Sequence, residues 1–219
     1  MKPRSKPQTR GARDGDTERR ILDAARQVFM RRGTAGARMQ EIAEEAGVNQ
    51  ALLHYYFRSK DGLSEAVFLD AANKLVPAVV QALSGEGTLA RKIERFVHLY
   101  IDTVRKSPYL PGYILSEMHH NPDRIPTLLA KVAGSDAASQ AGRLRRRLDE
   151  FLRAAAKAGE IRPIRAEQLV VNVVALCVFP FVARPILGAA LEMTDRTFDQ
   201  FLTERRAELP GFILNALRP

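Results

Sequence analysis

The sequence contains a single cysteine, Cys177, among 219 residues, so no disulfide can form within the chain. A chain without disulfides suits a reducing compartment, and we therefore expect a cytoplasmic location. The first 16 residues lack the apolar segment that a secretory signal requires. The longest apolar run, residues 169–183, is shorter than the ~20 residues of a membrane-spanning helix, contains Pro180 and is followed by Arg184. We therefore predict no membrane span.

Patterns that carry catalysis or bind cofactors are also missing. The sequence has no glycine-rich phosphate loop and no serine–histidine–aspartate arrangement, so we expect neither an enzyme nor a cofactor. Cys177 lies in an apolar run, where a thiol is inert rather than nucleophilic. A metal-binding or enzymatic helical protein would have to use Glu117, His119 and His120, with His98. Adjacent histidines on a helix diverge by about 100°, which disfavours a shared metal, and no metal site is predicted.

Positive charge is in excess and is unevenly distributed. The formal net charge is +9 and the isoelectric point is about 10.0, which favours a polyanionic partner. Residues 1–63 contain 13 Lys and Arg against 8 Asp and Glu, so +5 of the +9 lies there. Residues 1–16, basic and rich in Pro, Gly and Thr, predict a disordered basic arm. Such an arm either contacts DNA or remains a solvated tail.

Residues 40–57 predict two short helices on either side of Gly47. Ile42, Ala43 and Ala46 are spaced i, i+1, i+4, which gives the first segment an apolar stripe. Glycine tolerates the positive φ that a tight turn requires. Two short helices joined in this way form a helix-turn-helix, whose second helix enters the major groove of DNA. Ordinary helical hairpins share this spacing, so the spacing alone leaves both interpretations open.

Apolar, glycine and capping residues recur through residues 17–63 at positions Ile21, Leu22, Asp23, Ala24, Ala25, Phe29, Gly33, Ile42, Ala43, Ala46, Gly47, Val48, Leu53, Phe57, Ser59, Lys60 and Leu63. This pattern resembles the N-terminal domain of TetR-type transcriptional regulators; the rest of the chain resembles the family only in length and helical character. The resemblance implies an all-α fold of about nine helices. It implies a DNA-binding helix-turn-helix domain over residues 17–63 and a ligand-binding and dimerisation domain over residues 64–219.

The resemblance also implies that Val48, Leu53 and Phe57 are buried, while the rest of the second helix faces DNA. Arg38 stands where the family usually has threonine; arginine cannot cap in the same way but can fork a phosphate. His54 stands where the family usually has tyrosine, so that phosphate contact is expected to be weaker or pH-sensitive. Glutamine can pair with adenine, small apolar side chains contact thymine methyls, and tyrosine hydroxyls bind phosphates. The candidate DNA-binding residues are Arg38, Gln40, Gln50, Ala51, Leu52, His54, Tyr55, Tyr56 and Lys60.

Further helices are predicted along the second part of the chain. Pro77 is expected to kink or end the helix that begins near Ser59. Thr88 can cap a helix whose apolar stripe is Leu89, Ile93, Phe96, Val97, Tyr100, Ile101 and Val104. A helix over residues 136–158 carries a run of arginines. We interpret this run as a solvated face balanced by Asp149 and Glu150 rather than as a nucleic-acid contact.

The C-terminal part of the sequence predicts two helices suited to dimerisation. Residues 169–183 are apolar on all sides, which predicts a helix buried all round. The last helix, from about Asp195, has an apolar stripe that Pro210 interrupts. In TetR-like proteins the two C-terminal helices supply a two-fold four-helix interface. A purely intramolecular core is the alternative.

Taken together, these features predict a homodimeric regulator that binds a palindromic double-stranded DNA operator, and the resemblance implies a repressor. A small apolar or aromatic effector would favour a state that no longer fits the operator. The candidate effector-pocket residues, each of which also fits as plain core, are Phe96, Tyr100, Tyr113, Met118, His119, Leu176 and Phe179. The main alternative is a DNA-binding structural protein that has no effector.

Overall fold

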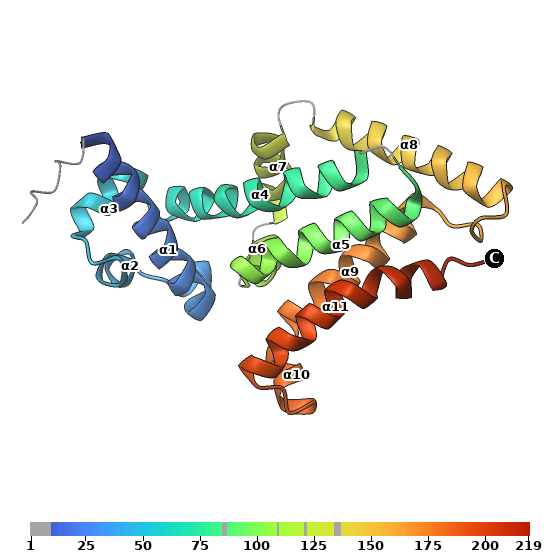
Figure 1. The fold of residues 1–219 in the computed structure, drawn as a ribbon. Coiled ribbons are helices and arrows are strands. Elements are labelled where there is room, and N and C mark those ends of the chain that lie inside the picture. Colours follow the sequence, from blue (N-terminus) through green and yellow to red (C-terminus); the bar gives the residue numbers. More distant parts are fainter. Residues whose placement is uncertain (1–9, 85–86, 109, 121, 134–136) are drawn as a thin grey trace, which may run out of the picture. The chain divides into compact units, whose positions relative to one another are not determined.

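The computed structural model describes residues 10–84, 87–108, 110–120, 122–133 and 137–219. These residues form eleven α-helices and one 3-10 helix, and they include no β-strand (Figure 1). The all-α prediction is confirmed, although the helices outnumber the nine or so that we expected. The chain divides into two compact units, Met1–Asp70 and Ala71–Pro219.

The first unit contains α1 (Arg10–Gly36), α2 (Met39–Ala46), α3 (Gln50–Phe57) and the beginning of α4 (Lys60–Ser84). Helix α1 begins at Arg10, so residues 10–16 of the predicted basic arm are helical, and the rest of that arm lies outside the described residues. The backbone of α1 leaves the helical conformation at Gly33, where φ is 68°. The core of this unit is built from residues with fully buried side chains: Ile21, Val28, Ile42, Leu53 and Leu63.

The second unit contains the remaining helices: α5 (Leu89–Lys106), α6 (Leu110–His120), the 3-10 helix η1 (Pro122–Arg124), α7 (Ile125–Ala133), α8 (Ala137–Lys157), α9 (Ala166–Val182), α10 (Arg184–Ala190) and α11 (Asp195–Asn215). The short helices α7, with nine residues, and α10, with seven, raise the count above our expectation. Helix α4 continues through Pro77 to Ser84, so Pro77 does not end it.

Helix α5 has the structure that its sequence pattern predicts. The Thr88 hydroxyl oxygen accepts a hydrogen bond from the backbone N–H of Arg91 (3.4 Å) and caps the helix. All seven predicted stripe residues, from Leu89 to Val104, are buried. They pack in one core with residues of α8, α9 and α11. Because the stripe has a clear helical period, the sequence alone identified the buried side of this helix.

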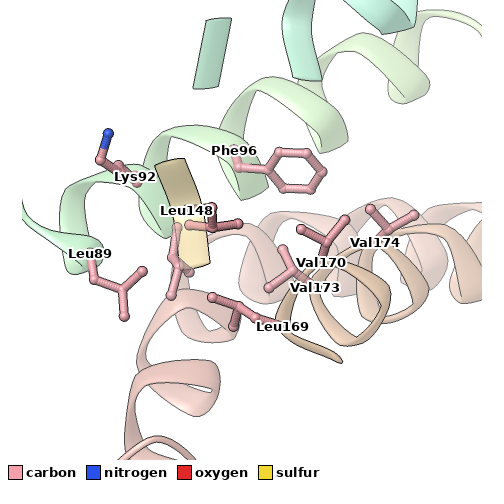
Figure 2. A pocket seen from close by; sticks show the side chains of 9 residues that line it. Leu89, Lys92, Phe96, Leu148, Leu169, Val170, Val173 and Val174 are labelled. Carbon is pink, nitrogen blue, oxygen red and sulfur yellow. The ribbon is translucent and has the colours of Figure 1, made fainter. Parts of the chain in front are cut away.

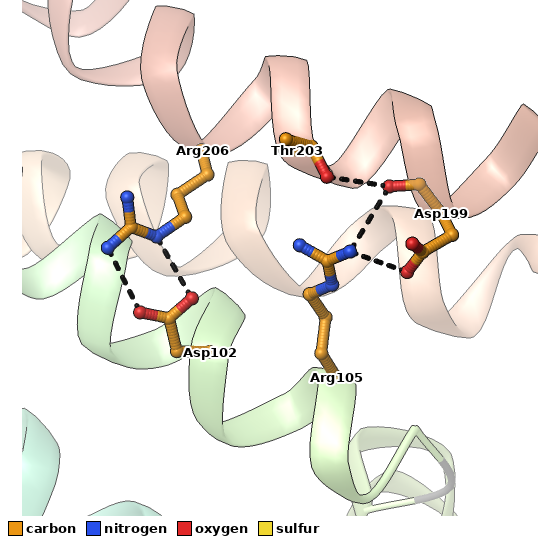
Figure 3. Close-up of polar contacts among 5 residues, drawn as sticks. All are labelled: Asp102, Arg105, Asp199, Thr203 and Arg206. Carbon is orange, nitrogen blue, oxygen red and sulfur yellow. Dashed lines mark hydrogen bonds and ion pairs between the residues drawn. The ribbon is translucent and has the colours of Figure 1, made fainter.

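Ion pairs at the edge of this core join α5 to α11 (Figure 3). The Arg206 guanidinium binds both carboxylate oxygens of Asp102, at 2.9 and 3.1 Å. One helical turn away along α5, Arg105 donates to the Asp199 carboxylate at 2.6 Å, and the Thr203 hydroxyl donates to the Asp199 carbonyl at 3.0 Å. Pairs of this kind fix the register of two helices more than they stabilise them, because surface ion pairs contribute about 0–1 kcal/mol.

Helix α9 is not buried all round, and this prediction is wrong. Val171, Phe179 and Val182 have 63%, 59% and 40% of their surface exposed, whereas Val173 and Cys177 are buried. One side of α9 packs in the core, and the side that faces outward carries these apolar residues together with Glu167, Gln168 and Asn172. Among the described residues, no single helix is long and apolar enough to cross a membrane; α9 and α10 meet those criteria only as a pair, bent by 68°.

Pro180 leaves a gap in the hydrogen bonding of α9, and an arginine from α11 fills it. Proline has no N–H to donate to the carbonyl of Leu176, four residues earlier. Arg205 instead donates two hydrogen bonds to that carbonyl, at 2.7 Å from Nη2 and 3.2 Å from Nε. Its guanidinium also lies 5.7 Å from the centre of the Phe201 ring. The side chain is half-buried, and burial lowers the pKa of Arg205 from its ordinary value.

Candidate nucleic-acid interface

The turn between α2 and α3 is centred on Gly47, as the sequence predicts. Gly47 ends α2 with φ 61° and ψ 39°, a left-handed conformation that a β-carbon would strain. Arg20 of α1 donates from Nη2 to the carbonyl oxygens of Ala46 (2.7 Å) and Gly47 (3.1 Å). The end of α2 leaves these carbonyls without helical partners, so Arg20 holds the turn in place. Sequence reasoning did not identify this role of Arg20.

Both ends of α3 are fixed by side chains of its own segment. The Asn49 carbonyl oxygen Oδ1 accepts hydrogen bonds from the backbone N–H groups of Ala51 (2.6 Å) and Leu52 (3.2 Å). We did not predict this cap, although asparagine just before a helix is a recognisable signal. At the other end, Arg58 has φ 60°, and its carbonyl lies 3.1 Å from Nδ1 of His54. Since a carbonyl can only accept, the His54 ring carries its proton on Nδ1 in this contact.

The side chains of α3 divide into a buried set and an outward set. Leu53 and Phe57 are buried and Val48 just before the helix is half-buried. The exposed residues are Gln50, Ala51, His54 and Tyr55, and Tyr55 has 78% of its surface exposed. Leu52 and Tyr56 are half-buried. The outward side of α3 therefore presents an amide, an imidazole and a phenol around a small apolar residue.

Two of the predicted DNA-binding residues, Tyr56 and Lys60, are hydrogen-bonded to α1 or to the connection that follows it. The Tyr56 hydroxyl donates to Asp14 of α1 at 3.2 Å. The Lys60 ammonium donates to the carbonyls of Ala35 (2.9 Å) and Ala37 (3.3 Å). Lys60 therefore ties the start of α4 to the connection between α1 and α2, and two of its three donors are used in doing so.

The remaining two candidates lie on α2 or directly before it. Gln40 donates from its amide to the Glu44 carboxylate, one turn along α2, at 3.0 Å. Arg38 occupies the N-cap position of α2 and its side chain makes no capping bond. Its guanidinium is exposed, as is that of Arg58 beyond α3, and neither has an ion-pair partner among the described residues. Arg58 was not among our candidates; its only signal was a positive charge next to the second helix.

The acidic residues of α2 are paired with basic residues of α1. Arg31 binds Glu45 at 2.6 Å, and Arg32 lies 3.5 Å from Glu41. Deeper in the unit, the buried Arg26 forms ion pairs with Asp23 and with Asp70 near the middle of α4. These pairs neutralise carboxylates within the unit while Arg38 and Arg58 keep their charges at the surface.

The connection from α3 to α4 depends on a close approach at Gly62. The Ser59 hydroxyl oxygen accepts from the N–H of Gly62 at 3.1 Å, so Ser59 caps α4 as predicted. A β-carbon at Gly62 would lie 2.5 Å from the carbonyl oxygen of Phe57, which is closer than real contacts allow. A larger residue at position 62 would therefore have to displace the backbone at the end of α3.

The predicted effector-pocket residues do not converge on one cavity. Phe96 lines an apolar cavity between α5, α8 and α9, and Leu176 lines a different one between α9 and α11. Tyr100 and Tyr113 are buried, and Tyr100 stacks on Phe96 at 5.8 Å between ring centres. The other three are on the surface: Met118, His119 and Phe179.

The first cavity has a volume of about 30 Å³ (Figure 2). Its lining is apolar apart from Lys92, whose ammonium lies 5.8 Å from the centre of the Phe151 ring. The second cavity has a volume of about 220 Å³ and is lined by both apolar and charged residues, Arg205 among them. Among the described residues, no three metal-ligating side chains lie close enough to hold an ion, and the His120 side chain is outside that set.

Helices α2 and α3 are short and are joined at a left-handed glycine. Helix α3 is held at both ends and exposes one polar side. These features define a helix-turn-helix domain of the DNA-binding type. Residues 21–67 match the family model of bacterial regulatory proteins of the tetR family. The chain is 37% identical over 97 residues to the HTH-type transcriptional activator FasR of Mycolicibacterium smegmatis, covering 43% of this chain and 44% of that protein. It is 32% identical over 81 residues to the HTH-type transcriptional regulator BetI of Escherichia coli, covering 36% of this chain and 42% of that protein.

These matches identify a TetR-family DNA-binding domain in the N-terminal part of the chain, and they span less than half the length of these two relatives. Solved structures resemble it over more of its length. HlyIIR, a hemolysin II transcriptional regulator, has a TM-score of 0.56 and 21% identity, covering 94% of this chain and 99% of that one. The TetR family regulator PfmR from Thermus thermophilus has a TM-score of 0.57 and 20% identity, covering 74% and 84%. At this level of identity, the likeness establishes the fold alone.

Proposed function

We propose that the protein is a dimeric, ligand-responsive repressor that reads a palindromic DNA operator with α3. The observation that carries this proposal is the outward side of α3, where Gln50, Ala51 and Tyr55 are exposed, in a unit that also carries two surface guanidinium groups, Arg38 and Arg58. Caps at both ends hold this side in a fixed orientation, so its polar groups need no ordering when DNA binds.

These residues have two kinds of role in the proposed complex, contact with base edges and contact with phosphates. The Gln50 amide pairs with an adenine edge and Ala51 contacts a thymine methyl. The Tyr55 hydroxyl and the guanidinium groups of Arg38 and Arg58 bind phosphates, which supplies affinity and register but no sequence information. Tyr56 and Lys60 act mainly by positioning, because their polar atoms already bind Asp14 and the carbonyls after α1.

Dimerisation is proposed through the outer apolar side of α9, α10 and α11. The exposed large apolar residues of these helices are Val171, Phe179, Val182, Ile186, Leu191 and Phe212. Exposed apolar residues on neighbouring helices are typical of a protein interface, and a two-fold arrangement lets the same surface serve both copies. The 220 Å³ cavity between α9 and α11 opens beside Phe212 and provides a recess for an apolar side chain of a second copy.

The effector is proposed to enter at the apolar cavity between α5, α8 and α9. At about 30 Å³ the cavity is too small for a drug-sized molecule, so an effector would have to widen it. Widening would separate α5 from α9. An effector that binds the widened state more tightly than the narrow state would therefore shift the protein toward the widened state. The small volume also favours the second candidate function, a DNA-binding protein that has no effector.

A gel-shift assay with DNA from upstream of the protein's own gene tests the DNA-binding proposal. The wild type is expected to retard this DNA in preference to a scrambled duplex, and Gln50→Ala with Tyr55→Ala is expected to abolish the preference. Arg196→Ala, at an exposed position on α11, serves as the control and should retain it. Equal binding of both duplexes by the wild type at low salt would refute the proposal.

Two further measurements separate the finer claims. Phe212→Glu places a charge in the apolar surface, and light scattering should then report a monomer where the wild type is a dimer. Val173→Phe fills the small cavity, and thermal shifts with a panel of apolar and aromatic compounds should disappear in this variant. If no compound shifts the wild type, the effector-independent function is the better account.

A further inference from the structure

Helix α8 carries a stripe of exposed positive charge. Arg143, Arg146, Arg147, Arg153 and Lys157 are all exposed, and their helical positions fall within an arc of about 120°. Fourteen residues separate the first from the last, which corresponds to about 21 Å along the axis. We call these five residues the α8 basic stripe.

Of the two carboxylates that we expected to balance the arginines of α8, Asp149 pairs with Arg145, which lies outside the stripe. Asp149 turns away from the stripe: its Oδ1 accepts from the N–H of Ala166 at the start of α9 (2.9 Å), and its Oδ2 pairs with Arg145 (3.3 Å). Arg145 also binds Glu167 of α9 at 3.0 Å, so this arginine belongs to the α8–α9 contact. Glu150 is the single acidic residue of α8 within the stripe's arc.

We propose that the α8 basic stripe is a second, sequence-independent binding surface for the phosphate backbone of duplex DNA, in addition to α3. Four of its five residues are arginines, whose planar fork binds phosphate oxygens in pairs. About 21 Å of duplex carries about six phosphates on each strand, at a rise of about 3.4 Å. Because the strands wind around the axis, the stripe would contact those phosphates that face it.

The composition of the stripe favours nucleic acid over a protein partner. Among the described residues of α8, no large apolar side chain is exposed. Protein interfaces depend on buried aromatic or aliphatic anchors, and amphipathic membrane-binding helices also insert apolar residues. Backbone binding to DNA requires charge and hydrogen-bond donors alone, which is what this surface offers.

The salt dependence of binding to a short duplex without an operator sequence tests this proposal. The protein of residues 1–219 is compared with its variant Arg146→Gln/Arg147→Gln/Arg153→Gln. The control is Arg95→Gln/Arg196→Gln/Arg218→Gln, which removes the same charge from exposed positions outside α8. Each lost phosphate contact lowers the slope of log K against log salt by about 0.9, so the α8 variant should lose about 2 to 3 in slope. The control should lose less than about 1.

Two outcomes would overturn the proposal. One is an equal change of slope in both triple variants, which would mean that only net charge matters. The other is an unchanged DNA slope in the α8 variant together with weakened binding to phosphatidylserine vesicles, which would assign the stripe to a membrane surface. Repeating the comparison in a Gln50→Ala/Tyr55→Ala background separates this proposal from the function proposed above, because the slope difference should persist even where operator recognition is lost.

Discussion

The contact between Arg205 and the Leu176 carbonyl makes a specific prediction about stability. Replacing Arg205 with methionine keeps the length of the side chain but removes both hydrogen bonds, at 2.7 and 3.2 Å. The carbonyl would lose its donors, because Pro180 has no N–H to offer. A partly buried acceptor left without a donor costs about 1–3 kcal/mol, so Arg205→Met should lower the free energy of unfolding by about that much.

The cause of this loss can be isolated with a second substitution. In Pro180→Ala, the new backbone N–H can donate to Leu176 within the helix. Arg205→Met in that background should remove little more than the contact with the Phe201 ring, which contributes about 0.5–1 kcal/mol. The two substitutions should therefore show a coupling energy of about 1 kcal/mol. Independent sites deviate from additivity by only about 0.3–0.5 kcal/mol.

Chemical denaturation followed by circular dichroism measures all four proteins, at one protein concentration because association of copies would change the apparent stability. The neighbouring Arg206→Met is the control. Arg206 pairs with Asp102 at the edge of α5, so its loss should cost about 0–1 kcal/mol and add to that of Pro180→Ala. If Arg205→Met lowers the free energy of unfolding by the same amount in the wild type and in Pro180→Ala, the proposed role of Arg205 at the Leu176 carbonyl is refuted.

Three further predictions concern single positions. Gly62→Ala should destabilise the first unit by about 1–3 kcal/mol in urea denaturation, because its β-carbon would lie 2.5 Å from the Phe57 carbonyl; an unchanged midpoint would contradict this. Asn49→Ala should cost about 1 kcal/mol through loss of the α3 cap, and Asn49→Asp should restore most of it. Burial raises the pKa of Cys177 from 9.0 to about 12, so its contribution to stability is present below pH 9.0 and is lost as the pH rises through 12. The unfolding free energy should therefore fall more steeply above pH 9.0 in the wild type than in Cys177→Ala.

The parts of the fold that could be predicted are those whose sequence has a period. In α5, apolar and polar residues alternate at the helical spacing, and the buried side followed directly. In α9 nearly every residue is apolar, so the sequence held no signal for which side lies outward. That side is fixed by where α5 and α11 pack, which depends on contacts between distant parts of the chain.

The candidate DNA-binding site also has features that the sequence predicted and features that depend on contacts between distant residues. The exposure of Gln50, Ala51 and Tyr55 was expected from the resemblance to TetR-type regulators, and all three residues are exposed. The engagement of Tyr56 and Lys60 was not, because their partners lie 42 and 25 residues away in the sequence. Asp149 is a further example. Its charge is visible in the sequence, but its hydrogen bond from the N–H of Ala166 depends on how α8 and α9 pack together.

Under the proposed function, the length of α3 limits how much DNA sequence one copy of the protein can recognise. Eight helical residues span about 12 Å, which is the rise of three to four base pairs. A word of that size recurs by chance roughly once in 64 to 256 positions, while a bacterial chromosome offers on the order of a million or more competing sites. Two such words at a fixed separation would recur roughly once in 4,000 to 65,000 positions. Most of the discrimination would therefore come from the spacing that a paired molecule enforces and from the shape of the DNA between the words, rather than from any single side chain.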